Sequence, residues 1–225
     1  MTCYITDTET TGLIEPIEVI SLATASLELT ADNYHVGQVQ EEFFCPSKEI
    51  EWGAVATHGI VPEDLVGKRP SEAAILPADC THIVGHNIDY DWKALGKPAV
   101  KRICTLAMAR AAWPKLDSHS LGACLYYLLG PKASTREALK GAHGAATDVG
   151  LAASLLPTLL EELGEPTSIE ALWRVSEDAR IPKTMAFGKH KGKPIAQVDA
   201  GWVAWYRRQE DTDEYLLKAF RLAGK

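Results

Sequence analysis

Residues 2–13 read TCYITDTETTGL, and the prediction of the fold starts from this stretch. Its first part, CYITD (3–7), is rich in strand formers and predicts a β-strand. Asp7 and Glu9 follow at the strand's end, one residue apart, and precede two threonines and a glycine. Two like charges in so small a space repel each other, and a protonated partner or a metal ion is the usual remedy.

Length and composition indicate one ordinary domain, or one domain with a small appendix. The chain has 225 residues, of which 46% are hydrophobic and 24% charged, so we expect a normal packed core. No basic segment followed by an apolar stretch opens the chain, and no apolar run approaches ~18 residues, so we expect no signal peptide and no membrane span. The five cysteines are scattered without a C-x-x-C pair, which predicts buried, reduced thiols in a cytoplasmic protein.

The net charge of −7 is unevenly distributed. Residues 164–225 hold 11 basic and 9 acidic side chains (+2), which leaves 12 and 21 for residues 1–163 (−9). An acidic body with a mildly basic tail suits a protein that binds phosphates through metal ions. It suits a plain acidic globule equally well, so charge alone does not separate the two.

Hydrophobic patterning predicts a mixed α/β sheet with helices packed on it. Strands are expected at 3–7, 18–29 and 37–45, as an antiparallel meander, and again at 82–87 and 102–104. Helices are expected at 51–57, 62–67, 89–95, 105–112, 118–129 and 145–163.

A glycine- and proline-containing stretch, GEPTS (164–168), is the best candidate for a linker. We therefore predict a first domain over 1–163 and a small α+β extension over 164–225. The extension is expected to contain a helix near 168–178, a Gly/Lys-rich, hairpin-like segment at 186–195, and helices near 200–209 and 212–222.

Further acids stand at corresponding places along the first domain. Asp91 follows the strand predicted at 82–87, and His143 and Asp148 stand where the long helix begins. Acids from separate strand ends and a helix start can converge on one cleft. A set of acids without cysteine favours Mg²⁺ or Mn²⁺ over zinc, and two such ions about 3.5–4 Å apart can hold a phosphodiester and activate a water.

Four stretches in this order resemble the motifs of the DEDDh 3′→5′ exonucleases. They are DTETTGL (7–13), ATHGI (56–60), GHNIDYD (85–91) and HGAATD (143–148), with Gly85 and Tyr90 in place of the usual alanine and phenylalanine. The resemblance covers about residues 2–163. The stretch ICTLAMARAAWP (103–114) and the tail FGKHKGKPIAQV (187–198) are similar to the exonuclease X type within this family.

The resemblance implies a ribonuclease H-like mixed sheet and a metal-dependent enzyme that releases 5′-mononucleotides from 3′ ends of DNA, in repair or end processing. It implies two Mg²⁺ ions, for which Mn²⁺ can substitute. Asp7 would bridge the ions, Glu9 and Asp148 would hold the one that carries the attacking water, and Asp91 would support the second. His143 would be the general base, since a neutral imidazole accepts a proton near pH 7.

Other residues are expected at the substrate. Leu13 would wedge beside the last base, or it simply packs its loop, and Asn87 and His86 either contact the substrate or brace the Asp91 segment. The full set of expected substrate contacts is Thr8, Thr10, Thr11, Gly12, Leu13, His58 and Asn87, with possible phosphate contacts at Lys189, Lys191 and Lys193.

Two other functions remain open at this level. An RNA-trimming exonuclease of the ribonuclease T or oligoribonuclease type would use the same residues, so DNA and RNA are both candidate substrates. A non-catalytic nucleic-acid-binding module is the third possibility, and the intact set of Asp7, Glu9, Asp91, His143 and Asp148 argues against it. Protein partners and oligomeric state are not encoded in any recognisable pattern.

Overall fold

A computed structural model describes residues 2–225 and divides the chain into two compact units, with the boundary between Ser176 and Glu177. This boundary lies later than the predicted one near residue 163, because helix α7 (Ile169–Ala179) belongs to the first unit up to Ser176. The Ser176 hydroxyl accepts a hydrogen bond from the Cys104 backbone N–H at 2.8 Å, and Lys101 donates to Glu170 at 2.6 Å. The GEPTS segment is thus a connection inside the first unit.

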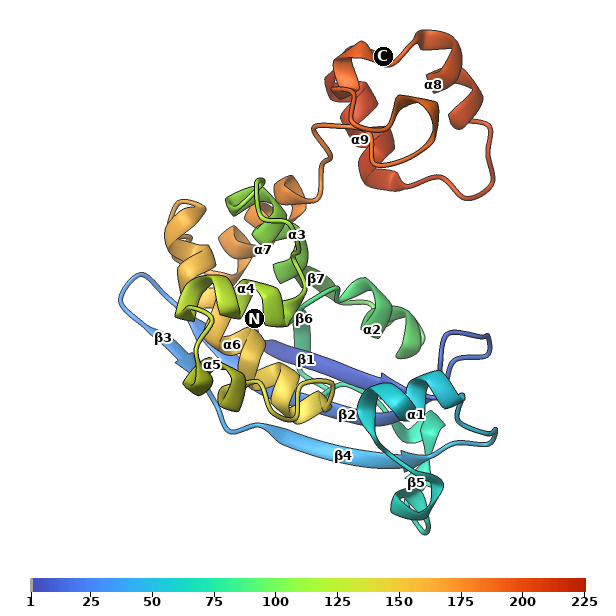
Figure 1. The fold of residues 1–225 in the computed structure, drawn as a ribbon, viewed down its shortest axis with the longest axis vertical. Helices are drawn as coiled ribbons and strands as arrows, with labels where there is room; N and C mark the ends of the chain where they lie inside the picture. The colour runs from blue at the N-terminus through green and yellow to red at the C-terminus, as the bar shows by residue number, and fades with distance from the viewer. Residues whose placement is uncertain (1) are drawn as a thin grey trace. The chain divides into compact units, whose positions relative to one another are not determined.

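The first unit is built on a mixed sheet in the order β5-β4-β2-β1-β6-β7, with β3 paired to β2 (Figure 1). β1 and β2, and β2 and β4, are antiparallel, whereas β1, β6 and β7 run parallel. The predicted third strand at 37–45 is present as β4, which begins at residue 40, and β3 is a short strand before it that the pattern did not predict. The strands are β1 (Thr2–Thr10), β2 (Val19–Leu29), β3 (Tyr34–Val36), β4 (Gln40–Cys45), β5 (Arg69–Pro70), β6 (Cys80–Gly85) and β7 (Lys101–Cys104).

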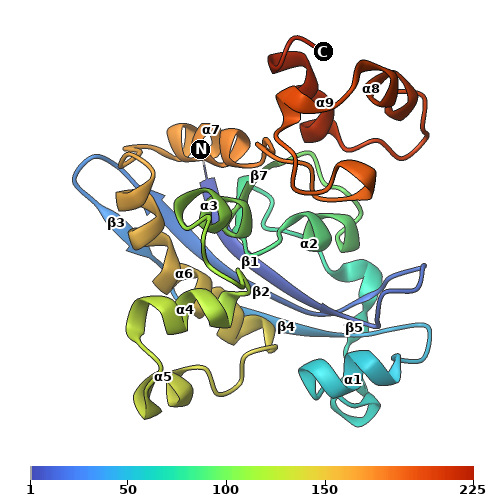
Figure 2. The same cartoon turned by 45° about the horizontal axis from the view of Figure 1, so that its top comes forward.

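Helices cover the sheet, and α6 runs across β1 and β2 (Figure 2). The expected helices are present in the residues described, with 62–65 as a short 3₁₀ turn, and α5 is a helix that the pattern did not predict. The helices of this unit are α1 (Trp52–His58), α2 (Asp89–Ala94), α3 (Thr105–Ala112), α4 (Leu121–Leu129), α5 (Ala133–Ala138) and α6 (Ala145–Glu162), followed by α7.

The two faces of β1 serve different helices. Thr8 and Thr10 bond through their hydroxyls to Asp91 and Tyr90 of α2, so the even-numbered face of β1 meets α2. Because side chains alternate along a strand, Asp7 and Glu9 share the opposite face. The apolar side chains of Ile5, Ile83 and Val84 are fully buried, as expected for central strands covered on both faces.

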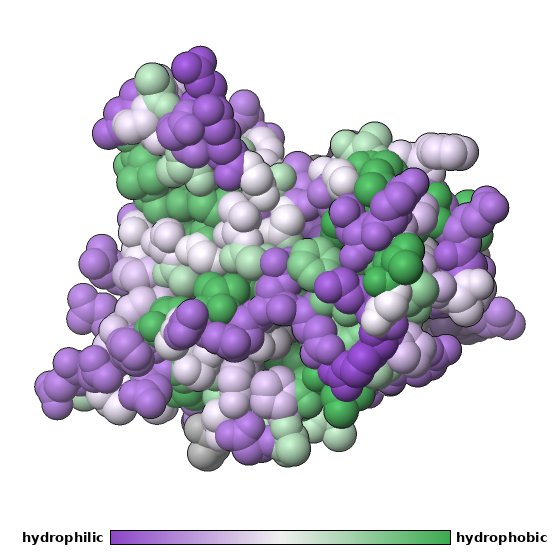
Figure 3. Space-filling model, turned by 90° about the horizontal axis from the view of Figure 1, so that it is seen from below, coloured by the Kyte–Doolittle hydropathy of each residue, from purple (hydrophilic) through white to green (hydrophobic). Residues whose placement is uncertain are grey.

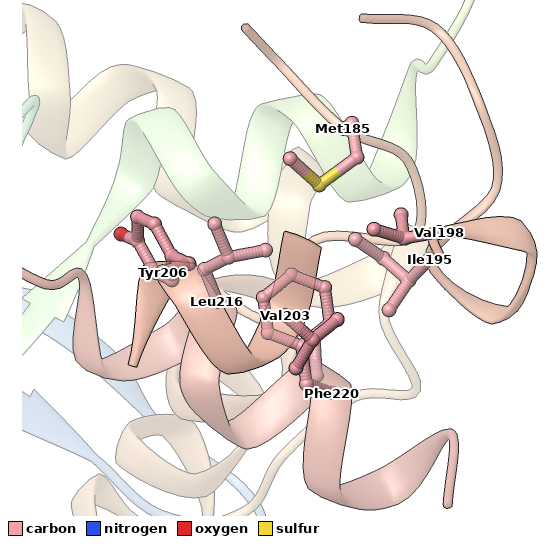
Figure 4. Close-up of a cluster of buried hydrophobic side chains, with 8 residues drawn as sticks. Met185, Ile195, Val198, Val203, Tyr206, Leu216 and Phe220 are labelled. Carbon is pink, nitrogen blue, oxygen red and sulfur yellow. The ribbon is translucent and has the colours of Figure 1, made fainter. Parts of the chain in front are cut away.

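The second unit has a hydrophobic core of its own, in which side chains from three segments meet (Figure 4). Met185 and Ile195 come from an irregular loop, Val203 and Tyr206 from α8 (Ala200–Tyr206), and Phe220 from α9 (Glu214–Leu222). The predicted helices near 200–209 and 212–222 are present as α8 and α9. A single bridge, Thr184 to Pro194, closes the loop where a hairpin was expected.

Hydrophobic surface occurs as scattered patches among hydrophilic side chains on the face drawn in Figure 3. All five cysteines are free, but only Cys3, Cys104 and Cys124 are buried; Cys45, at the end of β4, is exposed, so its predicted burial is wrong. In residues 2–225 no helix has the length and apolar character needed to cross a bilayer.

Candidate active site

The carboxylates predicted from separate segments come together around the end of β1. Asp7 and Glu9 project from β1, Asp148 lies in the first turn of α6, and Asp91 lies in the first turn of α2. The Asp91 and Asp148 charges act on both Asp7 and Glu9. The structure therefore builds one acidic site from three chain segments.

Asp91 is held by direct hydrogen bonds to β1. Its Oδ1 atom accepts from the Thr8 backbone N–H at 2.9 Å and from the Thr8 hydroxyl at 2.8 Å, and its side chain is almost fully buried. Thr8 was predicted to contact substrate. In the structure its hydroxyl is used to orient a carboxylate, although the residue also lines the neighbouring cavity.

All four carboxylates hold protons more tightly than usual. Burial is the largest cause at each of them, and it raises the pKa of Glu9 to about 8, with Asp148 and Asp91 adding repulsion. The pKa of Asp91 is raised to about 6 even though the two Thr8 hydrogen bonds lower it. Burial and the surrounding carboxylates raise the pKa of Asp7 well above its usual range, and burial raises that of Asp148.

A further acid, Glu41, adds to the negative charge around Asp7 and Glu9, and it was not predicted. The strand register aligns Asp7 with Ala23 and Ala23 with Glu41, so Glu41 lies on the same face two strands away, across a small alanine. Its charge raises the pKa of both Asp7 and Glu9. The Ser21 hydroxyl donates to Glu41 at 2.7 Å and fixes its position.

His143 stands on the turn before α6, one turn from Asp148. It is exposed, and its backbone has a φ of 70°, in the left-handed region. The His143 backbone N–H donates to Asp148 Oδ1 at 3.3 Å, and the imidazole is near enough to lower the pKa of Asp148. An exposed imidazole beside the carboxylates is free to turn toward a reacting group.

The loop after β1 is held open by Glu51. The Glu51 carboxylate accepts from the backbone N–H groups of Leu13 at 3.3 Å and Ile14 at 2.9 Å, and the Glu51 N–H donates to the Thr11 carbonyl at 2.8 Å. Gly12 has a φ of +142°, and a Cβ there would lie 2.1 Å from the Glu51 carboxyl carbon. Only glycine fits at position 12 while Glu51 holds the loop.

Tyr90, noted above as a departure from the family pattern, fastens the same loop from the other side. Its hydroxyl lies 2.6 Å from the Thr10 hydroxyl and donates to the Gly12 carbonyl at 3.0 Å. A phenylalanine would fill the space without these bonds. Gly85, which replaces the usual alanine, is explained by the backbone of β1. A Cβ at residue 85 would lie 2.7 Å from the Thr6 carbonyl oxygen.

A cavity of about 380 Å³ adjoins the acidic site. Glu9, Leu13 and His58 line it, and the Leu13 side chain is 76% exposed at its rim. His58 Nδ1 accepts from the Ile60 N–H at 2.9 Å, and burial lowers the pKa of His58, opposed by the Thr10 carbonyl. The cavity joins an acidic wall to an apolar rim. Its lining comprises Thr8, Glu9, Thr10, Gly12, Leu13, Glu51, Gly53, Ala54, Thr57, His58 and Tyr90.

Two of the expected substrate contacts, Thr11 and Asn87, and also His86, have other surroundings. Thr11 is fully buried, and its hydroxyl accepts from the Glu18 N–H at 3.2 Å, so it shapes the loop from within. Asn87 lines a different cavity, of about 540 Å³, with Arg110 and Ser118. His86 hydrogen bonds to the Thr105 hydroxyl and the His119 carbonyl, which is the bracing role considered above.

The donor set suits a hard divalent cation. It consists of carboxylates that hold protons because they crowd one another, and a divalent cation relieves that repulsion. Within residues 2–225 no three histidine, cysteine or acidic side chains lie close enough together, in the conformation described, to hold a metal ion. One oxygen of Asp91 is occupied by Thr8 and one of Asp148 by the His143 N–H, which leaves their second oxygens available.

The fold is that of the ribonuclease H-like exonucleases. It matches the structure of an exonuclease X in complex with 5′ overhanging duplex DNA, with a TM-score of 0.60 at 22% identity, over 77% of this chain and 99% of that chain. It also matches a zinc-bound complex of Escherichia coli exonuclease I with single-stranded DNA, with a TM-score of 0.54 at 21% identity, over 72% of this chain and 42% of that one.

A curated relative agrees with this resemblance. The chain is 27% identical over 207 residues to exodeoxyribonuclease 10 of Escherichia coli (strain K12), covering 89% of this chain and 88% of the relative. No protein-family model matches the chain. The predicted similarity to the DEDDh exonucleases, and to the exonuclease X type among them, is confirmed.

Proposed function

We propose that this protein is a metal-dependent DNA exonuclease that hydrolyses phosphodiester bonds from the 3′ end and releases 5′-mononucleotides, in DNA repair or end processing in the cytoplasm. The convergence of Asp7, Glu9, Asp91 and Asp148 beside a cavity is the observation that carries this proposal. The similarity to an exodeoxyribonuclease over most of both chains supports DNA as the substrate. The five free thiols suit a reducing compartment.

Asp7, Glu9, Asp91 and Asp148 would hold two Mg²⁺ ions, or Mn²⁺ in their place. When bound, such ions supply Lewis-acid stabilisation of the phosphoryl oxygens and lower the pKa of a coordinated water. Two further side chains support this site. The Thr8 hydroxyl orients Asp91 through a hydrogen bond, and Glu41 adds negative charge on the face of the sheet that carries Asp7, which strengthens the attraction for cations.

His143 is proposed as the general base that takes a proton from the attacking water. Its exposed position on a turn, with its N–H bonded to Asp148, leaves the ring free to approach the reacting phosphate. General-base catalysis of this kind contributes about 10²–10⁴-fold to a rate. The cavity beside Glu9 would receive the terminal nucleotide, with Leu13 and His58 at its walls and the Gly12 loop against the ribose.

The decisive experiment is hydrolysis of 3′- and 5′-end-labelled DNA and RNA, single- and double-stranded, with Mg²⁺, with Mn²⁺ and with EDTA. We expect mononucleotides to leave the 3′ end of DNA, and activity to vanish in EDTA. Asp7→Asn should lower the rate about 100-fold or more, because it removes one of the charges that hold the ions. Activity that survives EDTA or Asp7→Asn contradicts the metal mechanism, and cleavage of RNA alone identifies an RNA-trimming enzyme instead.

A further inference from the structure

The second unit carries a stretch of basic residues without any acid. Between residues 180 and 198 stand one arginine and four lysines and no aspartate or glutamate. The whole unit, 177–225, has 10 basic and 7 acidic residues, so it is positive in a chain whose net charge is −7. A positive surface on an otherwise acidic protein indicates an anionic ligand.

The loop that carries these lysines has a defined shape. Met185 and Lys193 face each other across it, with the Met185 N–H donating to the Lys193 carbonyl at 2.9 Å and the Gly192 N–H to the Met185 carbonyl at 2.8 Å. Gly188 and Gly192 take φ values of 66° and 81°, which allow the chain to turn back tightly. Met185, His190 and Ile195 are buried, and Lys189, Lys191 and Lys193 are exposed.

The lysines are available to a ligand. Within residues 2–225, Lys191 and Lys193 have no acidic partner, and Lys189 lies 3.5 Å from Asp199 in an exposed pair. Exposed pairs of this kind contribute little and yield readily to a competing anion.

Two half-exposed aromatic rings accompany the lysines. Phe187 is 44% exposed and Trp205 is 47% exposed, and both rings contact Trp202, at 6.1 Å and 5.5 Å between centroids. Trp202 itself stacks on Tyr206 at 5.3 Å with an interplanar angle of 7°. The exposed rings are therefore held on a packed aromatic base of Trp202 and Tyr206, which Phe220 contacts from the core.

We propose that Phe187, Trp205, Lys189, Lys191 and Lys193 form an aromatic–lysine surface that binds single-stranded nucleic acid, with bases stacked on the rings and phosphates paired with the lysines. Flat rings that are held rigid and half exposed suit bases, which offer a π-face whatever their sequence. An acidic peptide would satisfy the lysines but would leave the rings without a flat partner. The inference rests on the proposed function only in taking a polynucleotide as the substrate of the whole chain.

The test is the affinity of the full chain for a fluorescein-labelled oligothymidylate of about a dozen nucleotides in EDTA, where hydrolysis does not interfere. Trp205→Ala should weaken binding about 5- to 140-fold, since one stacked base contributes about 1–3 kcal/mol. Lys191→Gln with Lys193→Gln should reduce the slope of log K against log salt by about 1.4, because each phosphate contact on a single strand contributes about 0.7.

Matched controls come from the first unit. Tyr127→Ala removes a 56% exposed ring that contacts Trp113, and Lys132→Gln with Arg136→Gln removes two exposed charges. Neither control should change the affinity or the salt slope. Thermal melting shows whether Trp205→Ala loosens the core of the second unit. The lysine variants leave that core unchanged, so they test the proposal even where Trp205→Ala does loosen it.

Unchanged affinity and unchanged salt slope in both sets of variants would overturn the proposal. The proposal would also be overturned if the variants lost binding to a polyglutamate peptide but kept binding to the oligonucleotide. That result would identify the surface as a docking face for an acidic protein. A chain that fails to hydrolyse DNA, but whose aromatic–lysine variants lose the oligonucleotide, refutes the proposed function and leaves this inference standing.

Discussion

Replacing Gly12 with alanine should damage the loop beside the acidic site, and the structure says how. A Cβ at residue 12 would lie 2.1 Å from the Glu51 carboxyl carbon, and the φ of +142° disfavours any side chain. Backbone strain of this kind costs about 1–3 kcal/mol. Displacing Glu51 also breaks its bonds to the Leu13 and Ile14 N–H groups, which cost about another 1–3 kcal/mol, since water replaces part of them at an exposed site.

The two costs can be separated by a double-mutant cycle measured by urea unfolding. Gly12→Ala alone should lower the free energy of unfolding by about 2–6 kcal/mol. In a Glu51→Ala background the obstructing carboxylate is absent and its bonds are already lost, so Gly12→Ala should cost only the strain. The coupling between the two changes should therefore be about 1–3 kcal/mol.

Gly53→Ala is the matched control. Gly53 lines the same cavity from α1, and a Cβ there would have nothing within 4 Å, so the change should be neutral or slightly stabilising. The Michaelis constant for oligonucleotide should rise in Gly12→Ala and not in Gly53→Ala. Strictly additive effects of Gly12→Ala and Glu51→Ala would refute the reasoning, because they would show that the carboxylate does not occupy the space above Gly12.

Three further predictions concern the carboxylates and His143, the proposed general base. The pKa of Glu9 is raised from 4.5 to about 8, so the folded protein binds the Glu9 proton more tightly than the unfolded chain does. In EDTA, thermal stability should therefore fall as the pH rises from about 4.5 to about 8, and Mg²⁺ should reverse the fall. A flat pH profile would contradict the mutual repulsion of the carboxylates. Thr8→Val removes a hydrogen bond that lowers the pKa of Asp91, so the pH at which Mg²⁺ gives half of its maximal stabilisation should rise by about one unit. Thr6→Val is the control, because the Thr6 hydroxyl makes only a 3.5 Å contact with a backbone carbonyl. His143→Ala should lower turnover far more than substrate affinity, by about 10²–10⁴-fold; equal losses in both would show that it mainly shapes the site.

Much of the site was predictable because its signals are local. The spacing of Asp7 and Glu9 on one strand places both on one face whatever the rest of the chain does. Asp91 and Asp148 follow recognisable strand-to-helix and loop-to-helix transitions, and their order along the chain matches a known family. Gly12 also follows from sequence, as a glycine in a loop directly after a strand.

The contributions of Glu41 and Glu51 were not predictable, because they depend on pairings between distant segments. Glu41 and Glu42 are adjacent acids in one strand, and only the register across β2 decides that Glu41 shares a face with Asp7. Glu51 is one acid among many before a helix, and only the closeness of α1 to the β1 loop brings its carboxylate to the Leu13 N–H.

By itself, the sequence determined most of the succession of strands and helices, the positions of the four candidate carboxylates and His143 along the chain, and the basic character of the tail, since these depend on local propensity, spacing and composition. Tertiary structure alone decided that most of α7 belongs to the first unit, which cavity Asn87 lines, and how the Thr8 hydroxyl is used. The reason is physical. A hydrogen bond such as that from Thr8 to Asp91 joins residues far apart in the chain, and its formation depends on packing that no local pattern records.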